Sequence, residues 1–341
     1  MNTLRKKLEI LPGFVLALAI AALAKWLESL LPIHLIGASV IALFIGMGIH
    51  AVRKPGKLIQ TGLKFTSKKV LKFAIILLGA SLSIGTILQV GRLSLTVMVF
   101  TLLTCFGGGY FVGKKLGLNW KLSNLISAGT GICGGSAIAA VAPVIDADDS
   151  DIAYAMSATF LFDMAMILLF PIMGRALGLS DMAYGLWAGT AVNDTSSVVA
   201  ASYAFSEAAG DFATMVKLTR TLSIIPTVIV FSLISAHLKR KEQGQAAQTK
   251  KVNIVGLLPW FIVAFLVMAG INSLGLIPAA LSATLKSLSK FLMVAALAAI
   301  GLNTDLNKMK KAGINPMIHG FIISALVVVV AIAVEYAIGL V

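Results

Sequence analysis

Charged residues are scarce in this chain of 341 residues: only 12% are Asp, Glu, Lys or Arg, about half the share of an average soluble domain. Apolar residues make up 58% of the chain, and the mean hydropathy is +0.96. This composition excludes a disordered or collagen-like chain and argues against an ordinary soluble enzyme. We therefore expect a membrane protein that contacts the lipid bilayer, with no nucleic acid among its partners.

Cysteine and the common catalytic motifs are also scarce. Cys105 and Cys133 lie in apolar stretches, so no disulfide framework is expected. The chain contains neither an H-E-x-x-H motif nor a G-x-x-x-x-G-K-[ST] loop, and its histidines show no metal-ligand spacing. We therefore expect no enzyme activity, no resident metal and no cofactor.

Long apolar runs are abundant. Because a helix needs about 20 apolar residues to cross a bilayer, we take as candidate spans residues 10–27, 33–50, 70–87, 93–113, 153–174, 213–236, 254–272, 288–303 and 315–340. Two further apolar stretches, 123–145 and 183–205, are rich in Gly, Ser and Thr. The expected fold is an all-α polytopic membrane protein in which residues 1–341 form a single transmembrane unit.

The positive charges indicate a topology, because Lys and Arg concentrate in cytoplasmic loops. If the N-terminus is cytoplasmic, the basic clusters at 5–7, 53–72, 114–121, 239–251 and 308–311 all lie inside. Lys25, Arg92, Lys286 and Lys290 then lie outside. The net charge of +14 is therefore a topology signal, and it predicts a cytoplasmic N-terminus.

The chain matches itself twice without gaps. Residues 33–118 recur as 255–340 at an offset of 222, and residues 123–174 recur as 183–234 at an offset of 60. Repeated, interrupted apolar segments are the best sequence indication of a secondary transporter's binding site.

The two repeats constrain how the Gly-rich stretches lie in the membrane. If both stretches are re-entrant hairpins, there are nine crossings, and both repeats are inverted. If both cross as broken helices, there are eleven crossings, and the two repeat relations disagree. We prefer the hairpins because one assumption then explains both repeats; eleven crossings is the alternative.

The first Gly-rich stretch contains a G-x-G-x-x-G pattern at 129–134, but the apolar, helix-type flanks do not form the βαβ unit that nucleotide binding requires. Glycine weakens helix and permits positive φ, so we expect an interrupted helix whose following N-terminus attracts an anion. Small-residue helix packing is the alternative. The candidate substrate-binding residues here are Thr130, Cys133, Gly134, Gly135 and Ser136.

The second stretch carries polar side chains within an apolar run, where leaving them unpaired is costly. Its candidate substrate-binding residues are Thr190, Thr195 and Ser196, and Asn193 and Asp194 are candidates for binding a coupling H⁺ or Na⁺. A helix cap is the alternative role for the Asn-Asp-Thr cluster.

Ionisable residues within spans are rare and usually functional. Asp163 lies midway along one span, and Lys217 and Arg220 share a helix face in the next. We assign Asp163 and Lys217 to ion coupling and Arg220 to substrate binding, and we expect an Asp163–Arg220 pair. Glu335 lies near a span end, where a surface role is expected.

The sequence of residues 129–140 (GTGICGGSAIAA) and of residues 193–197 (NDTSS) resembles the YeiH-type family of bacterial inner-membrane proteins, described as sulfate exporters. This family is similar to the bile-acid/sodium symporters and cation/proton antiporters. The resemblance implies a panel domain and a core domain related by inverted repeats, with the site where two interrupted helices meet. The chain lacks the Pro usual in the interrupted-helix motif of the bile-acid group.

These observations predict a secondary transporter of a small anion, of the sulfate, sulfonate or carboxylate class, coupled to H⁺ or Na⁺. A cation/proton antiporter-like exchanger and a non-transporting membrane sensor or scaffold are the alternatives. The expected location is the bacterial inner membrane, and relatives of this architecture occur both as monomers and as homodimers.

Overall fold

The computed structural model describes residues 2–30, 38–243, 260–304 and 313–341, and all regular structure in these ranges is helical. The starts of the expected spans 33–50 and 254–272 lie outside the described residues, as do Lys250, Lys251 and the basic cluster at 308–311. The all-α expectation is confirmed for the described chain.

Within the described ranges, six helices are long and apolar enough to cross a membrane. They are Glu9–Leu30, Ile84–Lys115, Ser150–Ala176, Glu207–Leu238, Ala279–Asn303 and Ile314–Ala337, and Val40–Val52 and Trp260–Ser273 are shorter apolar helices. The chain is therefore a multi-pass membrane protein by length and hydropathy; the number of crossings stays a prediction.

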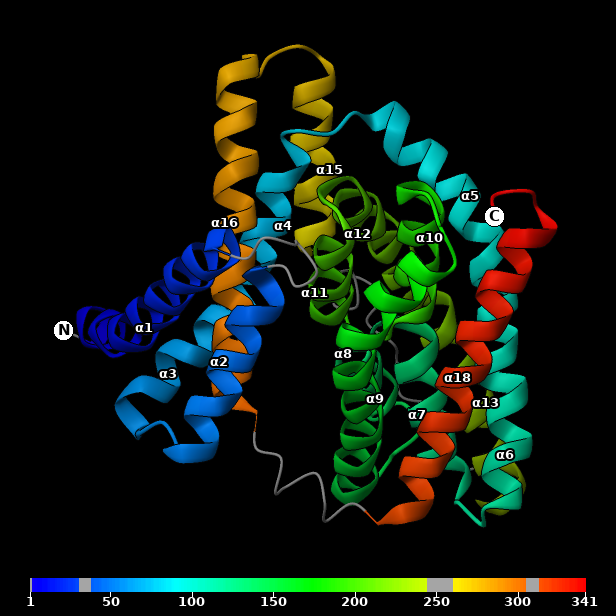
Figure 1. Cartoon of the computed structure of the whole chain (residues 1–341). Coiled ribbons are helices and arrows are strands. Elements are labelled where there is room, and N and C mark those ends of the chain that lie inside the picture. The colour runs from blue at the N-terminus through cyan, green and yellow to red at the C-terminus, as the bar shows by residue number, and fades with distance from the viewer. Residues whose placement is uncertain (1, 31–37, 244–259, 305–312) are drawn as a thin grey trace.

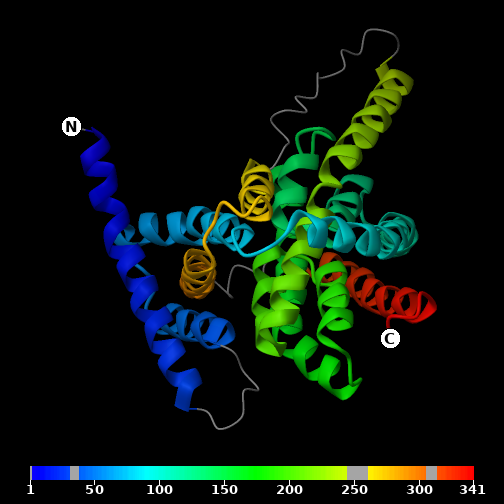
Figure 2. The ribbon, with the colours of Figure 1, turned by 90° about the horizontal axis from the view of Figure 1, so that it is seen from above.

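The helices form two groups, which Figure 2 shows side by side. We call the first group the panel. It contains α1 (Asn2–Leu30), α2 (Ala38–Val52), the continuous run α3 (Lys57–Phe65), η1 (Thr66–Val70) and α4 (Leu71–Gly79), then α15 (Trp260–Ser273) and α16 (Ala279–Asn303).

We call the second group the core. It contains α5 (Ile84–Leu103), η2 (Thr104–Gly108), α6 (Gly109–Lys115), α7 (Trp120–Ala128), η3 (Gly129–Cys133), α8 (Gly135–Val141), α9 (Asp149–Ala176), α10 (Asp181–Ala191), α11 (Thr195–Phe205), α12 (Glu207–Thr221), α13 (Ile224–Gln243) and α18 (Ile314–Ala337). In Figure 1 the panel lies to the left and the core to the right.

One expected span has the wrong boundaries. The helix predicted at 70–87 runs from Lys57 to Gly79, and a turn follows before α5. The Ser83 side chain caps α5 by accepting a hydrogen bond from the Thr86 N–H at 3.1 Å, which fixes where the next helix begins. Hydropathy alone missed the start because Lys64, Lys68 and Lys69 lie on this helix and not in a loop.

Equivalent elements recur at both offsets. At 222 residues, α2 corresponds to α15, and the run from α3 to α4 corresponds to α16. At 60 residues, α7 corresponds to α10, α8 to α11, and α9 to α12 and α13 together. The helix boundaries thus follow the sequence repeats, although α9 is continuous where its counterpart is broken before Ile224.

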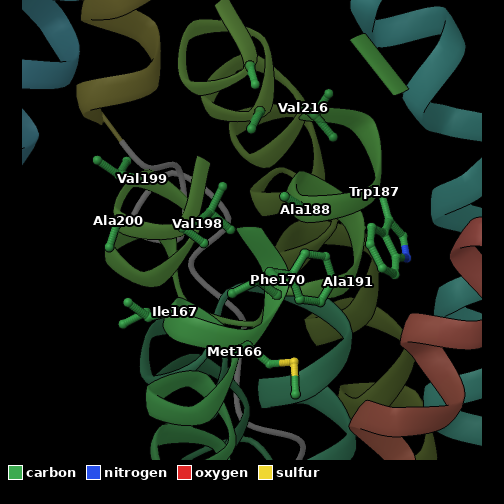
Figure 3. Close-up of a cluster of buried hydrophobic side chains, with 14 of the residues drawn as sticks. Met166, Ile167, Phe170, Trp187, Ala188, Ala191, Val198, Val199, Ala200 and Val216 are labelled. Carbon is green, nitrogen blue, oxygen red and sulfur yellow. The ribbon is translucent and has the colours of Figure 1, made fainter. Parts of the chain in front are cut away.

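Large apolar side chains join the core helices. Figure 3 shows Phe170 of α9 beside Trp187 of α10, with their ring centroids 4.3 Å apart. The Trp187 indole N–H donates to the Val328 carbonyl at 2.9 Å, which ties α10 to α18. Val198 and Val199 of α11 and Val216 of α12 belong to the same cluster. The core is therefore packed around the second Gly-rich stretch.

The panel helices approach each other through glycine. A Cβ on Gly46 of α2 would lie 2.5 Å from the Ala298 carbonyl oxygen of α16, whereas a Cβ on Gly48 would have nothing within 4 Å. The Gly46→Ala substitution is therefore expected to lower the free energy of unfolding by about 1–3 kcal/mol through overpacking. Gly48→Ala, two residues along the same helix, should leave it unchanged or raise it by up to about 1 kcal/mol. Thermal unfolding of the purified protein in detergent measures both; equal effects would contradict the close contact.

Candidate functional site

The first Gly-rich stretch folds back on itself. The chain runs through α7 and η3, turns at Gly134 with φ 65° and ψ −133°, and returns through α8. The Asn119 side-chain amide at the start of α7 donates to Asp151 at 3.2 Å, and the Lys121 ammonium donates to the Asp146 carbonyl at 2.7 Å. Asp146 and Asp151 come after α8 in the chain, and both lie beside the start of α7. Residues 120–141 therefore form a hairpin, which we call the first hairpin.

The second Gly-rich stretch does the same. After α10 the chain is extended at Val192 and Asp194, and it returns through α11. The Ser206 hydroxyl, just beyond α11, donates to Asp181 at the start of α10 at 2.5 Å. The Tyr184 and Phe205 rings stack with centroids 3.9 Å apart. Residues 181–205 therefore form the second hairpin.

The two hairpins approach from opposite ends of α9. Asp151, near the start of α9, holds the open end of the first hairpin. Arg175, near the end of α9, donates to the Ala204 carbonyl of the second hairpin at 3.0 Å. We call these the Asp149 end and the Ala176 end of the core. Each of these two stretches therefore begins and ends at one end of the core; whether it re-enters one membrane face stays a prediction.

The hairpin tips meet in the middle of the core. A Cβ on Gly134 would lie 3.1 Å from the Asp194 Cβ, so the first tip approaches the second tip through a glycine. Gly134 also has a positive φ, which residues with a side chain rarely adopt. The close contact and the backbone conformation therefore both require glycine here.

Asp163, midway along α9, binds the second tip through backbone groups. Its carboxylate oxygens accept hydrogen bonds from the N–H groups of Asn193 and Asp194, each at 2.9 Å. The side chain is 1% exposed. The expected Asp163–Arg220 pair is wrong: both residues are described, and no ion pair joins them. Asp163 instead satisfies N–H groups that the interrupted helix leaves without a helical partner.

Lys217 and Arg220 of α12 hold carbonyl groups of both tips. The Lys217 ammonium donates to the carbonyls of Ile132 at 2.8 Å and Val192 at 3.0 Å. The Arg220 guanidinium donates to the Gly131 and Thr130 carbonyls at 2.7 and 2.6 Å, and to Val192 at 3.2 Å.

Both cationic side chains are fully buried, with Lys217 0% and Arg220 1% exposed. Lys217 is therefore not a surface residue. The two positive charges bridge the hairpins by satisfying carbonyls that the interrupted helices leave without a partner.

The remaining polar groups of the second tip are only partly satisfied. Asp194 caps α11 by accepting from the Ser196 N–H at 2.9 Å and from the Ser196 hydroxyl. The Asn193 amide nitrogen donates to the Ser324 hydroxyl at 3.4 Å, while its Oδ1 is buried without a hydrogen-bond partner. Asp194 and Thr195 are half-buried, so the tip is partly accessible.

Not every predicted residue faces the meeting point of the tips. The Thr190 hydroxyl donates to the Leu186 carbonyl of its own helix at 2.7 Å, and Thr190 is fully buried. Cys133 is a buried free thiol. At the first tip Gly135 is half-buried and Ser136 is exposed, so these two residues are accessible.

Sequence reasoning missed Ser324 of α18. Its hydroxyl lies 3.5 Å from the Thr130 hydroxyl of the first tip and also accepts from Asn193 of the second. A lone serine in an apolar helix gave no signal. The surface role expected for Glu335 is also wrong: its side chain is 0% exposed, and both carboxylate oxygens are without a hydrogen-bond partner.

A cavity of about 320 Å³ lies between the panel and the core. It is lined by Ser67, Met156, Ser157, Phe160, Ile300, Asn303 and Thr304. Met156 also lies beside the first tip, since a Cβ on Gly135 would be 3.8 Å from its methyl carbon. The cavity therefore reaches the neighbourhood of the hairpin tips from the Asp149 end.

The buried cations predict a strong effect on stability. In Arg220→Met the carbonyls of Thr130 and Gly131 lose their donors, so we expect the free energy of unfolding to fall by about 2–5 kcal/mol. Arg220→Lys should have a free energy of unfolding between those of the original protein and Arg220→Met, because lysine keeps the positive charge but lacks the planar guanidinium. The exposed Arg92→Gln is the control. Thermal unfolding in detergent measures all three, and a neutral Arg220→Met would contradict the bridging role.

Comparison with known proteins places the whole chain among similar sequences. The profile of a family described as "Conserved hypothetical protein 698" matches residues 12–320. A UPF0324 membrane protein of Clostridium tetani is 54% identical over 334 residues, which cover 96% of this chain and 97% of the relative.

Two streptococcal proteins extend the comparison. A UPF0324 membrane protein of Streptococcus pneumoniae is 40% identical over 332 residues, covering 96% of this chain and 97% of the relative. One of Streptococcus mutans is 38% identical over 341 residues, covering 98% and 99%. The similarity therefore includes both hairpins and the panel.

Proposed function

The chain belongs to the UPF0324 family of membrane proteins, the YeiH type, and we propose that it is a secondary transporter of a small anion. The family membership confirms the resemblance drawn from residues 129–140 and 193–197. The substrate class that we propose is sulfate, a sulfonate or a carboxylate.

One observation carries the proposal: two hairpins from opposite ends of the core meet at a buried cluster of charged side chains, next to a cavity between two helical groups. Interrupted helices that meet near mid-membrane are where many secondary transporters bind substrate. Irregular backbone at such depth is tolerated only inside protein or along a watered cavity. A purely structural role gives no reason for a cavity at this position.

The accessible tip residues favour an anion. The first turns of α8 and α11 begin at the two tips, and helix N-termini attract negative charge. Gly135, Ser136 and Thr195 are the proposed substrate contacts, because Ser136 is exposed and Gly135 and Thr195 are only half-buried. Ser196 would orient the Asp194 carboxylate by donating hydrogen bonds to it, and the buried Thr130 and Cys133 would pack beneath the first tip without contacting the substrate.

The coupling ion that we propose is H⁺ or Na⁺, bound at the second tip. Asp163, Asp194, Lys217 and Arg220 together bring two negative and two positive charges to the tips. Carbonyls of interrupted helices often bind Na⁺ in transporters, but here Lys217 and Arg220 already hold the carbonyls of both tips. This argues against Na⁺ at those carbonyls and leaves Asn193 and Asp194 as the candidate Na⁺ ligands, with the carboxylates of Asp163 and Asp194 as the candidate H⁺ sites.

The competing functions make different predictions. A cation/proton antiporter-like exchanger would move Na⁺ or H⁺ without an anion, and a membrane sensor or scaffold would move nothing. We favour the anion transporter because of the accessible helix N-termini. The proposed setting is the bacterial inner membrane with the N-terminus in the cytoplasm, as a monomer or homodimer, without enzyme activity.

Ligand-induced stabilisation is the first test. The purified protein is heated with a panel of sulfate, small sulfonates and carboxylates, with chloride as the reference. A true substrate at 100 times its dissociation constant should add about 2.7 kcal/mol to the free energy of unfolding. The Ser136→Ala and Asp194→Asn variants should lose most of this increment, whereas Arg92→Gln should keep it.

Transport is then measured in proteoliposomes with the stabilising anion, under an imposed H⁺ or Na⁺ gradient. We expect gradient-driven uptake that Asp194→Asn uncouples or abolishes. Uptake of Na⁺ without any anion would support the exchanger instead. If no anion stabilises the protein and no solute moves, the transporter proposal fails.

A further inference from the structure

Two ion pairs join the panel to the core at the Ala176 end. The Lys286 ammonium of α16 lies 2.5 Å from an Asp211 carboxylate oxygen of α12, and the Lys290 ammonium lies 2.6 Å from Glu207. Residue 207 follows directly after Ser206, which holds the open end of the second hairpin. The two ion pairs therefore connect the panel to the core at the Ala176 end.

The Lys286–Asp211 pair is partly buried, whereas the Glu207 side chain of the second pair is 77% exposed. The Tyr203 hydroxyl of α11 donates to the other Asp211 oxygen at 2.6 Å, and the Lys290 ammonium lies 5.8 Å from the Tyr203 ring centroid. Asp211 is only 8% exposed. A partly buried, hydrogen-bonded ion pair is worth more than an exposed one, whose median contribution is about 0–1 kcal/mol. We call the set Lys286, Lys290, Asp211, Glu207 and Tyr203 the closed latch.

The cavity lies toward the opposite end of the same helix. Asn303 ends α16 and lines the cavity, and it is 17 residues beyond Lys286. At 1.5 Å per residue, the latch and the cavity are about 25 Å apart along α16. Panel and core thus touch through charges at the Ala176 end and leave space between them toward the Asp149 end.

The repeats give three of the four paired residues charged counterparts elsewhere in the panel and the core. At the offset of 222, Lys286 and Lys290 correspond to Lys64 and Lys68 of the panel. At the offset of 60, Asp211 corresponds to Asp151 of α9. Glu207 corresponds to Ala147, which carries no charge, and the next residue is the exposed Asp148. With Asp148, these counterparts form a second set of charges.

Within the described ranges, this second set is not joined by ion pairs. Lys64 and Lys68 are exposed, and neither forms an ion pair within the described ranges. Asp151 accepts from Asn119 instead of from a lysine. The cavity lies near both parts of the set, since Ser67, next to Lys68, lines it from the panel and Ser157 lines it from α9, the helix that carries Asp151.

We propose that these two sets are alternating latches: the Lys286–Asp211 and Lys290–Glu207 pairs close one side of the protein, and Lys64–Asp151 with Lys68–Asp148 close the other side when the first pairs separate. The structure is then the state open at the Asp149 end. The lysines at 64, 68, 286 and 290 keep the two end states near balance, because each state has one latch closed.

The inference rests on the proposed function for its purpose, alternating access, but its test needs no substrate. In the purified full-length chain, Ser67→Cys is labelled with a polar maleimide through the cavity. The chain without Ser67→Cys gives the background from the buried Cys105 and Cys133.

Removing the closed latch with Lys286→Gln and Lys290→Gln should slow the labelling of Ser67→Cys by about threefold or more, because the cavity side now closes more often. The exposed Arg92→Gln is the matched control and should leave the rate unchanged. Lys290→Glu alone and Glu207→Lys alone should each alter the labelling rate of Ser67→Cys, and combining the two should restore it. An unfolded variant would not be restored by a second substitution.

Cross-linking tests the second latch directly. Lys68→Cys with Asp148→Cys joins two exposed positions, so folding is not at stake. We expect disulfide formation on mild oxidation to be about threefold or more faster when Lys286 and Lys290 are both replaced by Gln. Equal labelling and equal cross-linking in the presence and absence of the closed latch would overturn the proposal. If alternating latches are found but no anion binds or moves, the proposed function fails while this inference stands.

Discussion

The backbone groups at the two hairpin tips need partners away from bulk water, and three buried side chains supply them. Asp163 accepts N–H groups from the second tip, while Lys217 and Arg220 donate to carbonyls of both tips. An unsatisfied backbone group at membrane depth costs several kcal/mol. Without these side chains, the backbone groups of both helix interruptions would lack these partners.

The same contacts explain how ionisable side chains are accommodated inside the core. Isolated charges are very costly to bury, but each of these side chains is hydrogen-bonded to backbone dipoles. The charges also balance, with two carboxylates and two cations brought to the tips by α9, α11 and α12. The tips thus form a hydrogen-bonded polar centre in an apolar scaffold, with Asp194 half-buried and the start of α8 accessible.

The rest of the architecture follows from the position of this centre. The core presents it midway along α9, and the panel faces it through α2 and α16, which pack closely at Gly46 and Gly301. The cavity between the two groups lies toward the Asp149 end, where Met156 separates it from the first tip, and ion pairs join the groups at the Ala176 end. A two-ended arrangement of this kind is what a transporter needs in order to expose one site to two compartments in turn.

Much of the candidate site was readable from local patterns. The glycines at 129–135 predicted an interruption because glycine weakens helix wherever it occurs. The repeats predicted that the second interruption would mirror the first. Asp163, Lys217 and Arg220 stood out because charge is rare within apolar spans.

The sequence by itself therefore determined the membrane class, the repeated helices and the residues of the polar centre, because hydropathy, helix propensity and repeat register are properties of neighbouring residues. Only the tertiary structure decided their partners. It paired Asp163 with backbone N–H groups instead of Arg220, brought in Ser324 from α18 and buried Glu335. The reason is physical: a hydrogen bond depends on which distant segments come within about 3 Å of each other, and no local pattern encodes that distance.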